Sequence, residues 1–381
     1  MGKANCSEWA NFRGSRSTSG WSGRGGQTKN PYALDRNPSG SSSGSAAAVA
    51  ANLCAVAVGT ETNGSIVSPS SACGVVGVKP TVGLVSRSGV IPIAFSLDTA
   101  GPMTRTVRDA AVLLSVLAGV DADDKATADA EGKVVADYAK GLNVKALNGA
   151  TIGVVRSYFG FLDSMDAVLN DALEALKQQG ATLVDPVELA GQNRLGSAPF
   201  LVMLYEFKAG LTDYLARLGP KAPIKSLKEL IAFNDKNKRK ELPYFGQELL
   251  ISAEAKGPLT SKEYVDALEK CRKVTRAEGI DAVMDKHKLD ALIAPTAGPA
   301  GLTDAILGDH SRGGSSTPAA VAGYPTVTVP AGFVFGLPVG LSFFGRAWSE
   351  AKLLGLAYAF EQATKARKPP QFLATADLRP A

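Results

Sequence analysis

Histidine is nearly absent from this chain, which has two among its 381 residues, His287 and His310. A histidine acts as the base in hydrolases that use a Ser-His-Asp triad, so this scarcity restricts the chemistry that the chain can support. Both histidines stand in charged runs, "DKHKLD" and "GDHSRGG", which are typical of exposed segments. A histidine-dependent esterase is therefore the weakest enzymatic hypothesis for this sequence.

Clustered metal ligands are also missing from the sequence. The four cysteines are far apart, with no C-x-x-C pair and no Cys/His cluster, which argues against a zinc site and against a disulfide scaffold. We accordingly expect no metal and no cofactor. The cysteines are Cys6, Cys54, Cys73 and Cys271, and the second and third of them lie in apolar segments that predict core positions.

Charge and hydropathy argue against two further classes of protein. The net charge is only +5, and no run of lysine and arginine is dense enough to indicate nucleic-acid binding. The most basic stretch begins at Asn234 and is typical of a solvated helix end. No apolar run approaches the roughly 20 residues of a membrane span, and the first residues lack the apolar segment of a signal peptide. The expected location is the cytoplasm, unless a leader precedes Met1.

The order of predicted elements indicates an α/β protein in a single domain over residues 1–381. Thr106 and Asp109 form a capping box for a helix that ends near Gly119. Strand and helix patterns then alternate, and a mostly helical region at 196–256 is predicted to shape a substrate pocket or lid. The small apolar run at 46–58 predicts a helix that feeds a buried strand. Further strands are expected at 151–155, 181–189, 291–296, 326–332 and 340–345, and further helices at 164–180, 263–285 and 350–365.

The serines of this chain allow four interpretations, and the first two concern the hexamer "GSSSGS" at 40–45 alone. A flexible linker is disfavoured because an apolar segment follows directly and no folded module precedes it. A nucleophile elbow of the G-x-S-x-G type would use Ser42, but it needs a buried strand just before it, and "KNPYALDRNP" has no such pattern. A separate Ser-x-x-Lys pair, Ser349 and Lys352, is more simply the cap of a helix.

A fourth interpretation joins the serine cluster to the loop "GTETNGS" at 59–65. Glycines flank this loop, so successive backbone N–H groups can point into one concavity and hold an oxyanion. Ser65 would attack a carbonyl, and a serine of the first cluster would relay its proton. A relay without histidine must end on a lysine that burial and its neighbours keep neutral.

These motifs together resemble the amidase signature family. The resemblance rests on the serine cluster, on "GTETNGSI" at a fixed distance from it, on "GVKPT", and on "LDALIAPT" and "AAVAGYPTVTVPAGF" near the end of the chain. It implies an α/β/α sandwich around a mixed sheet. The combination "GSSSGSAAAVAANL" with "NGSIVSP" is most similar to bacterial peptide amidases, and less similar to the amidase component of glutamyl-tRNA amidotransferase.

The resemblance also implies residue roles. Ser65 corresponds to the nucleophile, and Ser41 to the bridging serine, whose peptide bond is cis in the family. The N–H groups of Thr62, Asn63, Gly64 and Ser65 would form the oxyanion hole, and Ser42 and Ser43 would support the loop. Three positions depart from the common family pattern. Glu61 stands where aspartate is common, Asn63 where glycine or aspartate is common, and Val67 where arginine is frequent.

The catalytic lysine of the family lies on a strand ahead of the serine cluster, farther upstream than residue 1. Lys3 matches a different segment, after that strand, and Lys79 in "GVKPT" matches a position with a structural role. The chain is therefore expected to start inside the family's domain, without its first strands and helices. The resulting prediction is an amidase that acts through an acyl-serine on a small-molecule or peptide amide, possibly a peptide C-terminal amide. The alternatives are an inactive amide-binding protein, a clipped enzyme and an amidotransferase component, and the oligomeric state stays open.

Overall fold

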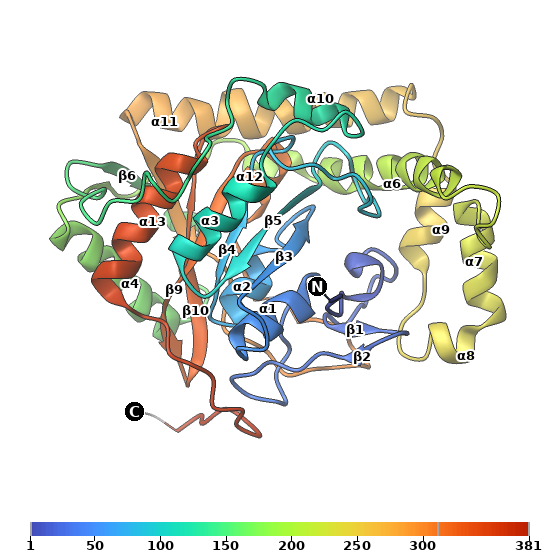
Figure 1. Ribbon diagram of the computed structural model, residues 1–381, viewed down its shortest axis with the longest axis horizontal. Helices are drawn as coiled ribbons and strands as arrows, with labels where there is room; N and C mark the ends of the chain where they lie inside the picture. Colours follow the sequence, from blue (N-terminus) through green and yellow to red (C-terminus); the bar gives the residue numbers. More distant parts are fainter. Residues whose placement is uncertain (1, 311, 380–381) are drawn as a thin grey trace.

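The computed structural model describes residues 2–310 and 312–379, which fold around an eight-stranded mixed sheet (Figure 1). In space the strands follow the order β3-β5-β4-β9-β10-β8-β6-β7. β6 runs parallel to β7 and β8, and the other neighbouring pairs are antiparallel. The strands are β3 (Val56–Glu61), β4 (Val76–Lys79), β5 (Thr99–Thr104), β6 (Thr151–Val154), β7 (Thr182–Val184), β8 (Ala291–Pro295), β9 (Thr326–Val334) and β10 (Leu337–Phe344), and a separate hairpin joins β1 (Trp21–Ser22) to β2 (Gly26–Gln27).

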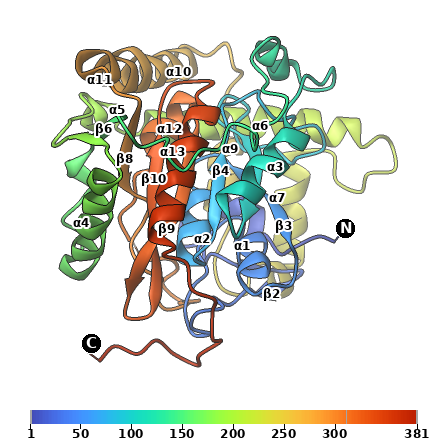
Figure 2. The ribbon, with the colours of Figure 1, turned by 60° about the vertical axis from the view of Figure 1, so that its left-hand side comes forward.

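Helices cover both faces of the sheet, which confirms the α/β/α sandwich (Figures 1 and 2). One layer packs on the sheet through α3, α4 and α13, and the opposite layer through α1, α2, α11 and α12. The bounds are α1 (Ser43–Ala50), α2 (Val67–Ala72), α3 (Val107–Leu117), α4 (Asp163–Gln178), α11 (Asp281–His287), α12 (Thr317–Ala322) and α13 (Glu350–Thr364).

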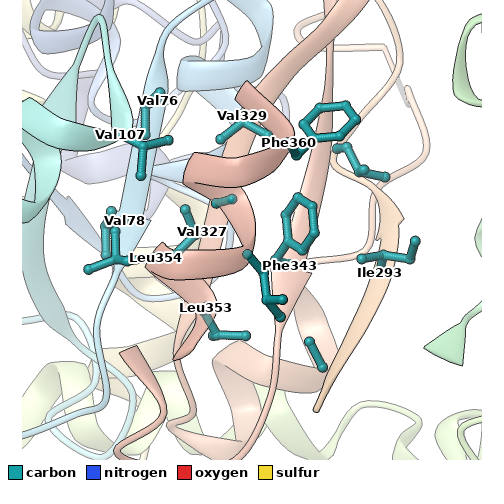
Figure 3. Close-up of a cluster of buried hydrophobic side chains, with 14 of the residues drawn as sticks. Val76, Val78, Val107, Ile293, Val327, Val329, Phe343, Leu353, Leu354 and Phe360 are labelled. Carbon is teal, nitrogen blue, oxygen red and sulfur yellow. The ribbon is translucent and has the colours of Figure 1, made fainter. Parts of the chain in front are cut away.

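The main core lies between the sheet and the first of these layers (Figure 3). Alternate residues of the central strands point toward α13, because successive side chains of a strand face opposite sides. Burying one such apolar side chain stabilises the fold by about 1.5–3 kcal/mol. The labelled contacts come from β4, β9, β10, β8, α3 and α13: Val76, Val78, Val327, Val329, Phe343, Ile293, Val107, Leu353, Leu354 and Phe360.

Several predicted elements are confirmed, with one break. Thr106 Oγ1 accepts a hydrogen bond from the Asp109 N–H and caps α3 as expected, although the helix ends at Leu117, just before Gly119. The single helix predicted at 263–285 is wrong. The structure divides it into α10 (Lys262–Thr275) and α11, joined by a π-helical turn (Arg276–Ile280). Gly279 permits this turn, because a Cβ there would lie 2.5 Å from the Val274 carbonyl oxygen.

The segment at 46–58 forms a helix and a strand, but the strand is not buried as predicted. β3 lies at the edge of the sheet and pairs only with β5 among the described strands. Val56 and Val58 are therefore 39% and 44% exposed. The serine cluster before this segment is not a linker, since Ser41, Ser42 and Ser43 are all buried and α1 begins at Ser43.

The region 196–256 is helical, as predicted, and lies to one side of the sandwich (Figure 1). Its buried face includes Phe207 and Leu211, which pack on Phe12 and on the loop at 93–97. None of the described helices has a stretch long and apolar enough to cross a membrane. The helices of the region are α6 (Ala198–Arg217), α7 (Leu227–Lys236), α8 (Lys238–Glu241) and α9 (Glu248–Glu254), and the short helix α5 (Gln192–Leu195) directly precedes it.

Candidate active site

The two serine-bearing segments meet where β3 ends. The serine cluster leads into α1, and residues 62–65 connect β3 to α2. The Ser42 N–H donates to the Ser65 carbonyl oxygen at 3.2 Å. The Ser42 hydroxyl donates to the Thr60 carbonyl at 3.0 Å and accepts from the Thr60 N–H at 3.0 Å. The cluster is thus bonded to the loop on both sides of residues 62–64.

Ser41 occupies an unusual position in this cluster. The Gly40–Ser41 peptide bond is cis, as the resemblance implied. Ser41 is fully buried, and its hydroxyl has no hydrogen-bond partner in the described chain. Ser41 also lines a cavity of about 20 Å³, together with Thr60, Glu61 and Thr62. Buried hydroxyls almost always have a partner, so this one invites a functional explanation.

The hydroxyls of Ser42 and Ser43 are engaged with the backbone. Ser43 Oγ donates to the Ser39 carbonyl at 2.6 Å and lies 3.1 Å from Ser7 Oγ. With the Ser42 hydroxyl bonded to Thr60, neither side chain is free in the way that a nucleophile elbow requires. Their contacts fit a supporting role.

The loop at 62–65 presents free backbone donors. The N–H groups of Asn63, Gly64 and Ser65 donate to no acceptor within residues 2–310 and 312–379. Gly64 has a φ of 84°, a left-handed conformation that glycine adopts without strain. Ser65 is half-buried at the end of the loop. Free N–H groups that face one concavity can stabilise an oxyanion.

The Glu61 side chain holds the end of this loop through two hydrogen bonds. Its Oε2 accepts from the N–H groups of Ile66 and Val67 at 2.8 and 3.1 Å. The carboxylate therefore bonds the residues directly after Ser65 and fixes where the loop turns into α2. Sequence reasoning noted Glu61 only as a departure from the common aspartate, and no local pattern indicated this pair of bonds.

Asp98 is a further site residue that the sequence did not single out. Thr62 Oγ1 donates to Asp98 Oδ1 at 2.6 Å, and the N–H groups of Ile93 and Ala94 both donate to Oδ2 at 2.9 Å. Burial raises the pKa of this carboxyl to about 6, against the lowering effect of these bonds. Asp98 thus bonds the first residue of the loop at 62–65 to the 87–98 loop. An acidic residue within "AFSLDTAGPM" is the only sequence signal for it.

Lys79 is a second lysine that could serve as the base, and it is completely buried on β4. Its Nζ donates to the Pro80 carbonyl at 2.9 Å. Burial lowers the pKa of the ammonium group to about 8, although the carboxylates of Glu61 and Glu350 act in the opposite direction. A lysine with such a pKa is partly neutral near pH 8, but its ammonium bonds a backbone carbonyl.

The other serine hypotheses find no support in the geometry. Ser349 Oγ donates to the Arg346 carbonyl, and Lys352 Nζ donates to Asp290, so this hydroxyl and amine have separate partners. Ser349 does occupy the N-cap position of α13, but its side chain makes no capping bond.

The histidines lie outside the serine site, and the two cysteines predicted as core residues differ in burial. The His310 side chain is 57% exposed and pairs with Asp304, while His287 ends α11. Cys73 is buried as predicted, whereas Cys54 is only half-buried. No group of three His, Cys, Asp or Glu side chains within the described ranges is placed to hold a metal ion.

The helical region contributes to a larger cleft that adjoins the Ser41 cavity, since Val90 and Asp98 line both. This cleft has a volume of about 890 Å³ and is formed by the loop at 87–98, the loop at 122–125 and the C-terminal part of α6. It includes Asp98 but neither Ser41 nor Ser65. Whether region 196–256 shapes the substrate pocket therefore stays a prediction.

The family described as "Amidase" matches residues 1–354. This chain belongs to the amidase signature family. A probable amidase of Arabidopsis thaliana is 41% identical over 98% of this chain and 69% of its own length. The glutamyl-tRNA(Gln) amidotransferase of Acinetobacter baylyi has an A-type subunit that is 37% identical over 96% of this chain and 73% of its own length.

A solved amidase structure extends the likeness to three dimensions. The native peptide amidase of Stenotrophomonas maltophilia has a TM-score of 0.92 and 52% identity, with 98% of this chain and 75% of that chain covered. The chain thus spans about seven tenths of the length of the relatives named above. For two fungal putative amidases these shares are 63% and 67%.

Proposed function

We propose that this chain takes part in hydrolysing a carboxamide through an acyl-enzyme intermediate on Ser65. The observation that carries the proposal is a buried, unpartnered hydroxyl, that of Ser41, next to a loop whose free N–H groups end on Ser65. Such a hydroxyl can accept a proton on one side and donate its own on the other. The family assignment supports the same reaction.

In the proposed reaction, Ser65 Oγ attacks the amide carbon and passes its proton to Ser41, while the proton of Ser41 passes to a base. The N–H groups of Thr62, Asn63, Gly64 and Ser65 stabilise the oxyanion. The C–N bond then breaks, the relayed proton reaches the nitrogen, and ammonia or an amine leaves. Water hydrolyses the acyl-serine by the same route. The resemblance assigns the base to a lysine that precedes the serine cluster in the family.

We further propose a peptide C-terminal amide as the substrate. The likeness to the peptide amidase of Stenotrophomonas maltophilia supports this choice. A second candidate is an amidotransferase-like reaction that releases ammonia from glutamine, which the likeness to the glutamyl-tRNA(Gln) amidotransferase supports. Ammonia release from a C-terminally amidated dipeptide and from free glutamine, measured side by side, separates the two.

The first experiment is labelling with a fluorophosphonate, followed by mass-spectrometric mapping of the modified residue. We expect the label on Ser65, with the label lost in Ser65→Ala and kept in Ser157→Ala, which changes an exposed serine outside the site. A label on Ser42 would favour the elbow instead. A folded chain that binds an amide without labelling or turnover would favour an amide-binding protein.

A further inference from the structure

A segment far along the chain, residues 312–317, lies against the oxyanion loop. Ser316 Oγ donates to Asn63 Oδ1 at 2.8 Å, and Asn63 Nδ2 donates to Thr317 Oγ1 at 3.2 Å. Both polar ends of the Asn63 side chain are therefore bonded to two successive residues at the start of α12. The peptide unit of Asn63 itself belongs to the loop that would hold the oxyanion.

The contact extends to the next residue of the loop. A Cβ on Gly64 would lie 3.0 Å from Ser316 Oγ and 3.1 Å from Ser68 Oγ. The Ser316 hydroxyl thus packs directly on the Gly64 backbone while it bonds Asn63. A single serine from the distant segment contacts two successive residues that carry free N–H groups.

The segment is itself fixed to the sheet and to the serine cluster. Ser315 Oγ donates to the Pro295 carbonyl at 2.6 Å, at the end of β8. The Arg312 guanidinium donates to Ser39 Oγ at 2.7 Å and to the Gly298 carbonyl at 3.3 Å. Residues 312–317 therefore contact both serine-bearing segments, one through Arg312 and one through Ser316.

We propose that Asn63 is a positioning residue, whose side chain, bonded to Ser316 and Thr317, sets the direction of the N–H groups of the oxyanion loop. The proposal rests on the proposed function of that loop. An oxyanion donor must be held within a few tenths of an ångström to be effective. The N–H groups of Asn63, Gly64 and Ser65 bond no other part of the described chain. The bonds made by the Asn63 side chain therefore restrain the middle of the loop, between the Asp98 bond to Thr62 and the Ser42 bond to Ser65.

The test compares two replacements of nearly equal size. Asn63→Leu removes both bonds, and we expect kcat to fall by about 10- to 100-fold, the order of losing part of one oxyanion donor, with KM changed much less. Asn63→Asp keeps two oxygen acceptors, and the hydroxyls of Ser316 and Thr317 can rotate to donate to them. We expect its kcat to fall less than that of Asn63→Leu, because both bonds can be kept.

The Ser316 side of the contact gives a second, independent measurement. Ser316→Ala should lower kcat by itself, and Asn63→Leu combined with Ser316→Ala should cost little more than Asn63→Leu alone, because both remove the same contact. Native kcat in Asn63→Leu, equal damage in Asn63→Asp and Asn63→Leu, or losses that multiply would each overturn the proposal.

Hydrogen exchange of the peptide at 62–68 separates this proposal from the proposed function. If the native chain neither turns over an amide nor accepts the label, the proposed function fails. Faster exchange in Asn63→Leu than in the native chain and in Asn63→Asp would still establish that the side chain restrains the loop. Equal exchange in all three would reject the restraint as well.

Discussion

Two segments hold the oxyanion loop, and they differ in what they bond. The near arm, residues 39–43, uses the Ser42 hydroxyl and N–H to bond backbone atoms of Thr60 and Ser65. The far arm, residues 312–317, uses Ser316 and Thr317 to bond the side chain of Asn63, and Ser316 is 253 residues from Asn63 in sequence. Backbone acceptors exist whatever residue occupies a position, whereas the far arm depends on the identity of residue 63. Substitutions in the loop should therefore disturb its contact with the far arm more than its contact with the near arm.

The largest effect is expected from the near arm, in Ser41→Ala. This change removes the one buried hydroxyl of that arm without a partner, so the fold loses no hydrogen bond within the described chain. If Ser41 relays protons, kcat should fall by about 10²- to 10⁴-fold, the usual contribution of a general acid–base group. Turnover of an amidated dipeptide is the measurement, with the exposed Ser157→Ala as the control. A loss of stability in place of a loss of kcat would contradict the relay.

The next largest effect should come from Gly64→Ala, which adds a methyl group between the loop and the far arm. The new Cβ would lie 3.0 Å from Ser316 Oγ, on a residue whose φ is 84°. We expect an activity loss of about 10²-fold, as for a displaced oxyanion donor. The double variant Gly64→Ala with Ser316→Gly removes this contact but also the Ser316 bond to Asn63, so it is compared with Ser316→Gly alone. Little further loss beyond Ser316→Gly would identify the contact with the far arm as the cause. Losses that multiply would assign the effect of Gly64→Ala to the backbone conformation and to the Ser68 hydroxyl, 3.1 Å from the new Cβ.

Ser42→Ala should act mainly on stability. It removes both hydrogen bonds to Thr60 and leaves a partly buried N–H and carbonyl at the end of β3 without their partner. The expected loss in the free energy of unfolding is about 1–3 kcal/mol, measured by urea denaturation. Ser45→Ala is the matched control, because it removes a single hydrogen bond, to the Val58 carbonyl, that is more exposed to solvent. If Ser42→Ala abolished labelling while stability stayed native, the nucleophile elbow would return.

The remaining effect is confined to the pH dependence of stability and concerns Asp98, which holds Thr62 independently of either arm. Burial raises its pKa from 3.8 to about 6, so between these values the folded state binds more protons than the unfolded state. Stability should therefore fall as pH rises from about 4 to about 6, by up to about 3 kcal/mol from this group. Asp98→Asn should flatten that part of the profile of unfolding free energy against pH. An unchanged slope would show that other groups cause it.

The near arm could be predicted from sequence and the far arm could not. The serine cluster and "GTETNGS" are close in the chain, and their spacing carries the family resemblance, so Ser41, Ser42 and Ser65 were identified together. Ser316 and Thr317 lie in a segment, "GGSSTP", that has no chemical signature of its own. Only tertiary contacts bring it to Asn63: Ser315 is bonded to the end of β8, and Ser316 and Thr317 reach the loop after β3, although four strands separate β8 from β3 in the sheet.

The same contrast holds for the fold. Local patterns predicted the capped helix α3 and most strands of the sheet, though not β5, because caps and alternation are properties of neighbouring residues. They did not predict that β3 lies at the edge of the sheet, since "AVAVG" is equally apolar in an edge strand and in a central one. The break between α10 and α11 was also missed, because Gly279 within a helical pattern is compatible with a continuous helix.

Lys79 gives the molecule a built-in reporter of opening. Its amine is fully enclosed on a central strand, and burial lowers its pKa to about 8. No reagent can reach this amine while β4 stays in the sheet. Once the sheet opens, the burial that lowers its pKa is lost, and the amine reacts like that of an exposed lysine. The rate at which this one lysine is acetylated, compared with the rates of the exposed lysines, would report how often the centre of the sheet opens.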